Sequence, residues 1–159
     1  SVKIHEEINA NFEAFLESLG IPYRRLVICT GDLSLGKVKQ YDTEAWIPSQ
    51  EQYRELSSAS YFHDFQTRRF NTRYEDEEGK KRYVHSLNNT AAATPRLLVA
   101  LVENYQQEDG SIKIPEVLRP YMNGRDVIRK ESAKSQSVPE ETSSGTPPSN
   151  EVLEEDNSN

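Results

Sequence analysis

The stretch "HSLNNTAAATPRLLVALVENYQ", residues 85–106, places an arginine at the predicted start of an amphipathic helix. Pro95 lacks an N–H group and fits only a first helical turn, so Thr94 is predicted as the N-cap and Arg96 as the second helical position. The free N–H groups of a helix start suit a phosphate, and a guanidinium adds a permanent positive charge there. Residues 91–93 are alanines and leave room for a ligand. The alternative is a surface arginine on an ordinary βα turn.

A second candidate is the run "YRELSSAS", residues 53–60, in which a carboxylate lies near several hydroxyl groups. Carboxylate and hydroxyl oxygens are ligands that suit Mg²⁺ held between a protein and phosphates. The alternative is a polar sheet surface without a ligand. On a regular strand, side chains alternate between the two faces. One face would then carry Tyr53, Glu55 and Ser57, and the other would carry Arg54, Leu56 and Ser58.

The third candidate is a group of six cationic side chains between residues 68 and 82, which could contact nucleic-acid phosphates. The acidic run "EDEE", residues 75–78, could equally neutralise them on a solvated surface, and this interpretation is favoured for the lysines. The three histidines show no metal-ligand spacing, so no zinc site is predicted. The cationic residues are Arg68, Arg69, Arg73, Lys80, Lys81 and Arg82.

The elements that must position these residues follow from hydrophobic periodicity. One helical face is predicted over residues 2–19, with Gly20 as its C-terminal cap. Strands are predicted over residues 23–30, 41–48 and 53–60. The apolar residues assigned to the face of the first helix are Ile4, Ile8, Phe12, Phe15, Leu16 and Leu19.

A hairpin is predicted next, because Phe70, Thr72 and Tyr74 alternate with polar residues and "EDEEG" follows as a loop. Its return strand runs over residues 82–87, and the helix that carries Arg96 is predicted to end at Gly110. A short strand and a proline-containing turn close the folded part over residues 112–122. The strand connections are too short for parallel crossovers, so the fold class is α+β with a mainly antiparallel sheet flanked by helices.

Composition divides the chain of 159 residues into two parts. Residues 131–159 hold seven acids and one lysine, so nearly all of the net charge of −7 lies there. Residues 1–128 are predicted to fold as one unit, and residues 129–159 are predicted to form a disordered acidic tail because they contain too little apolar surface. Cys29 is the only cysteine, which favours a reduced intracellular setting, and no apolar run approaches the roughly 20 residues of a membrane span.

Taken in order, several motifs resemble those of one enzyme family. "YRELSS", "DFQTRR", "VENYQQEDG" and "PEVLRPYM" are similar to the C-terminal half of a seryl-tRNA synthetase catalytic domain, over residues 2–122. The resemblance implies a partial class II aminoacyl-tRNA synthetase fold that binds ATP. It also implies that residues 84–88 and the following helix form what that family calls motif 3.

The resemblance assigns roles residue by residue. Arg96 matches the motif 3 arginine that holds the ATP phosphates, and Asn88 and Thr90 match positions that line the serine pocket. The run from Glu55 to Ser58 matches the ATP-binding segment, with Glu55 and Ser58 expected on Mg²⁺ and phosphate oxygens. The four positions of that run are Glu55, Leu56, Ser57 and Ser58.

The expected reaction is the ATP-dependent activation of L-serine to seryl-adenylate, followed by transfer of the seryl group to tRNA(Ser). The family also implies a homodimer and a cytoplasmic location without a membrane, an organellar form remaining open. Motifs 1 and 2 and the tRNA-binding arm are not in this sequence, which starts at Ser1, so we expect a piece of a longer protein that is inactive alone. Two alternatives remain: a synthetase-derived regulatory protein without catalysis, and a paralogue that aminoacylates a carrier protein.

Overall fold

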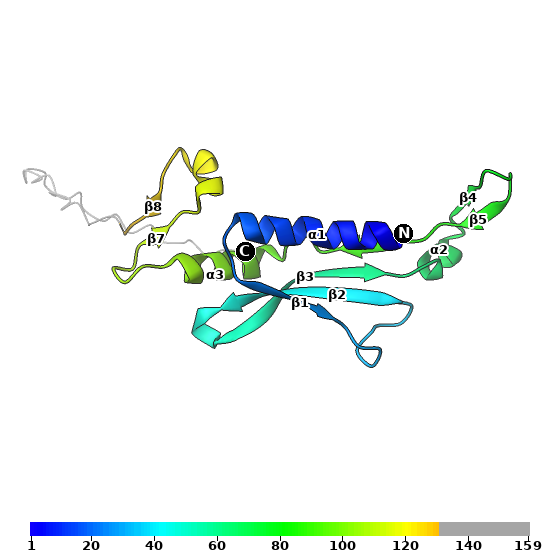
Figure 1. The fold of residues 1–159 in the computed structure, drawn as a ribbon, viewed down its shortest axis with the longest axis horizontal. Helices are drawn as coiled ribbons and strands as arrows, with labels where there is room; N and C mark the ends of the chain where they lie inside the picture. The colour runs from blue at the N-terminus through cyan, green and yellow to red at the C-terminus, as the bar shows by residue number, and fades with distance from the viewer. Residues whose placement is uncertain (131–159) are drawn as a thin grey trace, which may run out of the picture.

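The computed structural model describes residues 1–130, which form one four-stranded sheet with helices and two small two-stranded sheets (Figure 1). The prediction of a disordered tail over residues 129–159 falls almost entirely outside the described residues. None of the helices in residues 1–130 has the length and apolar character needed to cross a membrane. The elements are α1 Val2–Ser18, β1 Tyr23–Val27, β2 Lys39–Ile47, η1 Pro48–Gln50, β3 Gln52–Tyr61, α2 Phe65–Phe70, β4 Arg73–Glu75, β5 Lys81–Tyr83, β6 Leu87–Asn89, α3 Thr94–Tyr105, β7 Ile112–Lys113, η2 Glu116–Met122 and β8 Val127–Ile128.

The main sheet has four strands in the order β1-β2-β3-β6, and every neighbouring pair is antiparallel. This confirms the predicted α+β class with an antiparallel sheet. The β4–β5 hairpin and the two-stranded β7–β8 sheet are separate from it. Figure 1 shows α1 along the main sheet, with the β4–β5 hairpin and the β7–β8 region at opposite ends of the molecule.

Helix α1 packs on the sheet through a stripe that differs from the predicted one. Ile4 and Phe15 are 52% and 40% exposed, whereas His5 and Asn9 are buried. The reason is that both polar side chains find partners on the sheet: His5 Nε2 lies 2.9 Å from the carbonyl of Ala59, and Asn9 accepts from Thr43. The predicted end of the helix is confirmed, since the C-cap residue is followed by Gly20 at φ +66°. The core beneath α1 contains Phe12, Leu16, Leu19, Ile21, Ala45, Ile47, Leu56 and Ala100.

The predicted hairpin exists, but its boundaries were wrong. Phe70 ends the short helix α2, and Asn71 at φ +53° turns the chain before β4 begins at Arg73. The predicted return strand is also divided, into β5 and β6. Val84 and Ser86 lie between them, where the amide of Ser86 donates to the carbonyl of His63. This contact diverts the chain from the hairpin to the edge of β3, so β6 joins the main sheet.

Helix α3 starts close to the predicted position and ends earlier than expected. Its N-cap is Ala93 rather than Thr94, which makes Arg96 the third helical residue instead of the second. The helix ends at Tyr105, because Gln106 is extended and pairs with Ile112. Gly110 therefore does not terminate the helix. Gly110 lies in the turn that leads into β7. Strand β7 and the residues after it correspond to the predicted short strand and proline-containing turn.

Candidate functional site

A β-bulge in β3 decides which of the predicted residues share a face. Along the β2–β3 pair, Thr43 lies opposite Ser57 but Glu44 lies opposite Glu55, so Leu56 has no partner of its own. Beyond the bulge, Ser58 lies opposite Asp42. Since residues 42 and 44 share one face of β2, the side chains of Glu55 and Ser58 also share that face. The predicted strict alternation was wrong here: the extra residue brings Ser58 to the face of Glu55 and moves Ser57 to the other.

The two middle residues of the predicted ATP-binding run face α1 and the core. Leu56 is 1% exposed and belongs to the core cluster. Ser57 is 2% exposed, and its hydroxyl donates to the side-chain oxygen of Asn89. A ligand on the opposite face could therefore approach only the backbone of these two residues, whereas Glu55 and Ser58 present their side chains.

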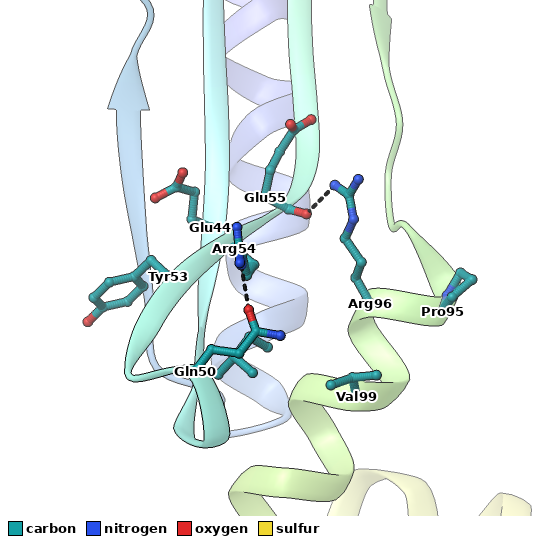
Figure 2. Close-up of a pocket in the computed structure, with 9 residues that line it drawn as sticks. Glu44, Gln50, Tyr53, Arg54, Glu55, Pro95, Arg96 and Val99 are labelled. Carbon is teal, nitrogen blue, oxygen red and sulfur yellow. Dashed lines mark hydrogen bonds between the residues drawn. The ribbon is translucent and has the colours of Figure 1, made fainter.

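Arg96 reaches the edge of β3 from the start of α3. Its Nη1 donates to the carbonyl oxygen of Glu55 at 2.8 Å, which links two segments 41 residues apart (Figure 2). Both residues line one cleft of about 550 Å³ between the start of β3 and the start of α3. A carboxylate and a guanidinium therefore line the same cleft, as the predicted nucleotide site requires.

Other charged side chains of the cleft were missed by the sequence reasoning. Glu44 lies on the same face as Glu55 and forms an ion pair with Arg24 at 2.7 Å. Arg54 also lines the cleft, and it donates to the side chain of Gln50 at 2.6 Å (Figure 2). The signal that could have found Glu44 was the alternation along residues 40–47, where it falls between buried neighbours. Nothing in the sequence indicated Arg54.

The predicted serine-binding residues lie farther along the same edge. Asn88 is opposite Ser60 in the β3–β6 pair, so it shares the face of Ser58 and is exposed. Thr90 is exposed, and its amide donates to the carbonyl of Ser58 at 3.3 Å. The next residue, Ala91, has φ +60°, a left-handed backbone conformation that alanine rarely adopts. Neither Asn88 nor Thr90 lines the cleft that contains Arg96.

Three of the six residues in the cationic group near the hairpin pair with local acids. Lys80 pairs with Glu78 at 2.8 Å, and Arg82 pairs with Asp76. The hydrogen bond from Arg82 holds the pKa of the Asp76 carboxyl below its ordinary value. The structure thus supports the solvated-surface interpretation for Lys80 and Arg82. The pair Arg68–Asp64, at 2.7 Å, follows the same pattern.

Comparison with known proteins gives consistent matches. The model for the class II core domain of tRNA synthetases (G, H, P, S and T) matches residues 1–105. The serine–tRNA ligase of Bdellovibrio bacteriovorus is 51% identical over 130 residues, and that of Deinococcus radiodurans is 50% identical over 127 residues. These matches cover 82% and 80% of this chain but only 30% of each relative.

Two solved structures share the fold. The seryl-tRNA synthetase of Pyrococcus horikoshii, complexed with ATP, matches with a TM-score of 0.76 and 50% identity over 80% of this chain and 29% of that chain. The cytoplasmic serine–tRNA ligase of Naegleria fowleri, in complex with AMP, matches with a TM-score of 0.74 and 42% identity, over 82% of this chain and 30% of that chain. The chain therefore belongs to the class II tRNA synthetase core domain family, as a segment of a seryl-tRNA synthetase catalytic domain.

Proposed function

We propose that this segment supplies the motif 3 side of an active site that activates L-serine with ATP and passes the seryl group to tRNA(Ser). The observation that carries the proposal is the placement of Glu55, Ser58 and Arg96. The bulge puts Glu55 and Ser58 on one face, and Arg96 is anchored at the edge of the same strand. The two structural relatives are complexes with ATP and AMP, which supports a nucleotide as the ligand of this fold.

Arg96 is the proposed contact for the ATP phosphates. Its Nη1 is held by the Glu55 carbonyl, and within residues 1–130 the guanidinium makes no other hydrogen bond. The remaining N–H groups can therefore meet the negative charge that develops as pyrophosphate leaves. A donor that is already anchored needs little reorganisation during the reaction, which is the main way such groups accelerate it.

Glu55 and Ser58 are the proposed ligands of Mg²⁺. A carboxylate and a hydroxyl on one face are hard oxygen donors, and Mg²⁺ usually takes one or two protein oxygens together with phosphates and water. Within residues 1–130, no group of three or more His, Cys, Asp and Glu side chains could hold a metal ion. Glu55 and Ser58 would therefore hold the proposed ion together with oxygens of the nucleotide. The ion would neutralise part of the phosphate charge.

Asn88 and Thr90 are the proposed serine-binding residues. A site built to pair with a substrate hydroxyl rejects analogues that lack it, because its own polar groups are then left without a partner. Asn88 lies on the edge strand β6, and Thr90 lies in the loop after it, where its amide contacts Ser58. Serine would therefore be bound beside the nucleotide. A homodimeric complete protein and a cytoplasmic location belong to the same proposal, the latter supported by the cytoplasmic Naegleria relative.

The test is serine-dependent ATP–pyrophosphate exchange by the complete protein that carries this chain. Arg96→Ala is expected to lower exchange by about 10²–10³-fold, the usual cost of removing one preorganised donor. Arg69→Ala is the matched control, since Arg69 is also exposed and also donates to a backbone carbonyl, that of Phe65 at 2.9 Å. Exchange at the wild-type rate in a folded Arg96→Ala protein would remove Arg96 from the site.

The 159-residue chain by itself is expected to show no exchange. It spans about 30% of the length of the relatives it matches, so the proposed site lacks the groups that the rest of those proteins contribute. The same assay with purified chain tests this. Robust exchange by the chain alone would contradict the assignment of the reaction to a larger active site.

A further inference from the structure

Asn89 lies between the two predicted serine-binding residues but faces the opposite side of the sheet. In the β3–β6 pair it is opposite Ala59, which is 1% exposed and faces α1. Neither the sequence reasoning nor the resemblance gave Asn89 a role. Its side chain nevertheless makes three hydrogen bonds, which join α1, β3 and the loop that carries Thr90.

The three bonds use both ends of the amide. The side-chain oxygen accepts from the buried hydroxyl of Ser57 and from the amide of Ala91, the latter at 3.2 Å. The side-chain nitrogen donates to the carbonyl of Ile8 in α1 at 3.0 Å. A flipped amide would set its NH₂ against the Ala91 N–H and its oxygen against the Ile8 carbonyl, so these partners fix the orientation of the group.

The bond to the Ala91 amide acts on the most strained point of the loop. Ala91 has φ +60°, which costs an alanine roughly 1–2 kcal/mol relative to its usual conformations. Such a conformation persists only when surrounding contacts hold it. The contacts here are the Asn89 side chain and three backbone bonds, from Thr90 to Ser58 at 3.3 Å and from Ala92 to Thr90 and Ala93 to Leu56 at 2.8 Å each.

We propose that Asn89, supported by Ser57, is a positioning residue that sets the place of Thr90 and thereby the affinity for the serine hydroxyl. The inference rests on the proposed function. Asn89 is only partly accessible and lies on the α1 side, so it would not touch the substrate. It acts through the turn at Ala91, which determines where the exposed Thr90 side chain lies.

The kinetic test uses Asn89→Ala in the complete protein. The KM for serine is expected to rise about tenfold, as for the loss of one well-made hydrogen bond, while the KM for ATP stays within about twofold. Ser57→Ala is expected to raise the serine KM by less. The double variant should match Asn89→Ala alone, because both changes break the same linkage.

The control is Ser111→Ala, which removes another part-buried side-chain pair, between the Ser111 hydroxyl and Asp109 at 2.5 Å, away from Thr90. It should change neither KM. A parallel rise of both KM values in Asn89→Ala would indicate a general structural role and overturn the proposal. If Asn89→Ala does not fold, Ser57→Ala alone decides, and an unchanged serine KM there overturns the proposal too.

A second readout does not depend on catalysis. Hydrogen exchange of the Ala91 amide should accelerate by about tenfold in Asn89→Ala, because the amide loses its acceptor. An unchanged exchange rate overturns the inference. If wild-type protein shows no serine-dependent reaction, the proposed function fails and this inference fails with it. If wild type reacts but Asn89→Ala keeps its serine KM, this inference fails alone.

Discussion

The cleft between β3 and α3 and the region of α2 with the β4–β5 hairpin both expose arginines and carboxylates, but they use them differently. Near the hairpin, Arg82 and Lys80 pair with acids two to six residues away, Asp76 and Glu78. In the cleft, Arg96 is held by a backbone carbonyl that is 41 residues distant. Pairing with an acid neutralises a charge, whereas anchoring on a backbone carbonyl across the cleft leaves the charge of Arg96 available for a ligand.

The comparison also separates two kinds of sequence evidence. The cationic run near the hairpin was the more conspicuous pattern, with six basic residues in fifteen positions. A single arginine, Arg96, and a single glutamate, Glu55, were by themselves weak evidence for a functional site. Surface ion pairs contribute about 0–1 kcal/mol each and are screened by salt, so their number says little about function. The position of a charge relative to a cleft says more.

Among the effects expected from this comparison, the largest contrasts the carboxylates of the two regions. Glu55→Gln in the complete protein should lower serine-dependent exchange by about 10²-fold, because the neutral amide is a poor Mg²⁺ ligand and no longer offsets cationic charge. Asp76→Asn should leave exchange within about twofold, since Asp76 pairs only with its own hairpin. Exchange assays over a range of Mg²⁺ concentrations check both. Equal losses in the two variants would erase the distinction between the regions.

The next effect compares an apolar residue from each region. Leu56→Ala should lower the free energy of unfolding by about 3 kcal/mol, because Leu56 is fully buried at the bulge and its removal leaves a cavity. Phe70→Ala should change it by less than about 0.5 kcal/mol, since Phe70 is 80% exposed. Urea unfolding of the 159-residue chain measures both. A small loss in Leu56→Ala would mean that the bulge does not depend on core packing.

A smaller effect concerns the left-handed residues of the two regions. Ala91→Gly should stabilise the chain by about 1 kcal/mol, because glycine adopts φ +60° without strain. Asn71→Gly should change stability by only a few tenths of a kcal/mol, as asparagine tolerates its φ of +53°. Thermal unfolding of both variants provides the measurement. A destabilised Ala91→Gly would show that the unfolded-state entropy of glycine outweighs the strain.

The smallest expected effect is the pH dependence of the hairpin. The hydrogen bond from Arg82 lowers the pKa of Asp76, so its contribution to stability is present above the unfolded pKa of about 3.9 and is lost as pH falls through the lowered folded value. Arg82→Gln should return the pKa of Asp76 toward its ordinary value. NMR titration of the Asp76 carboxyl carbon, at low and at high salt, measures this pKa in wild type and in Arg82→Gln. An unshifted pKa in wild type would mean that the ion pair does not persist in solution.

Much of the fold was predictable from local patterns. The three long strands, the first helix with its Gly20 cap, and the helix that carries Arg96 were all expected close to their observed places. The antiparallel class followed from the short connections. The errors concerned Phe70, Gly110 and the return strand, where tertiary contacts compete with local pattern: Ser86 bonds to His63 and Gln106 pairs with Ile112.

The sequence by itself determined which chemical groups are available and that they occur in the order typical of seryl-tRNA synthetases. Only the tertiary structure decided which of them face the same way. The single unpaired residue Leu56 turns toward the core, because burying an apolar side chain is favourable, and it thereby brings Ser58 to the face of Glu55. Period-two reasoning cannot detect such a bulge, since it arises from packing against α1 and α3 and from the pairing with β2.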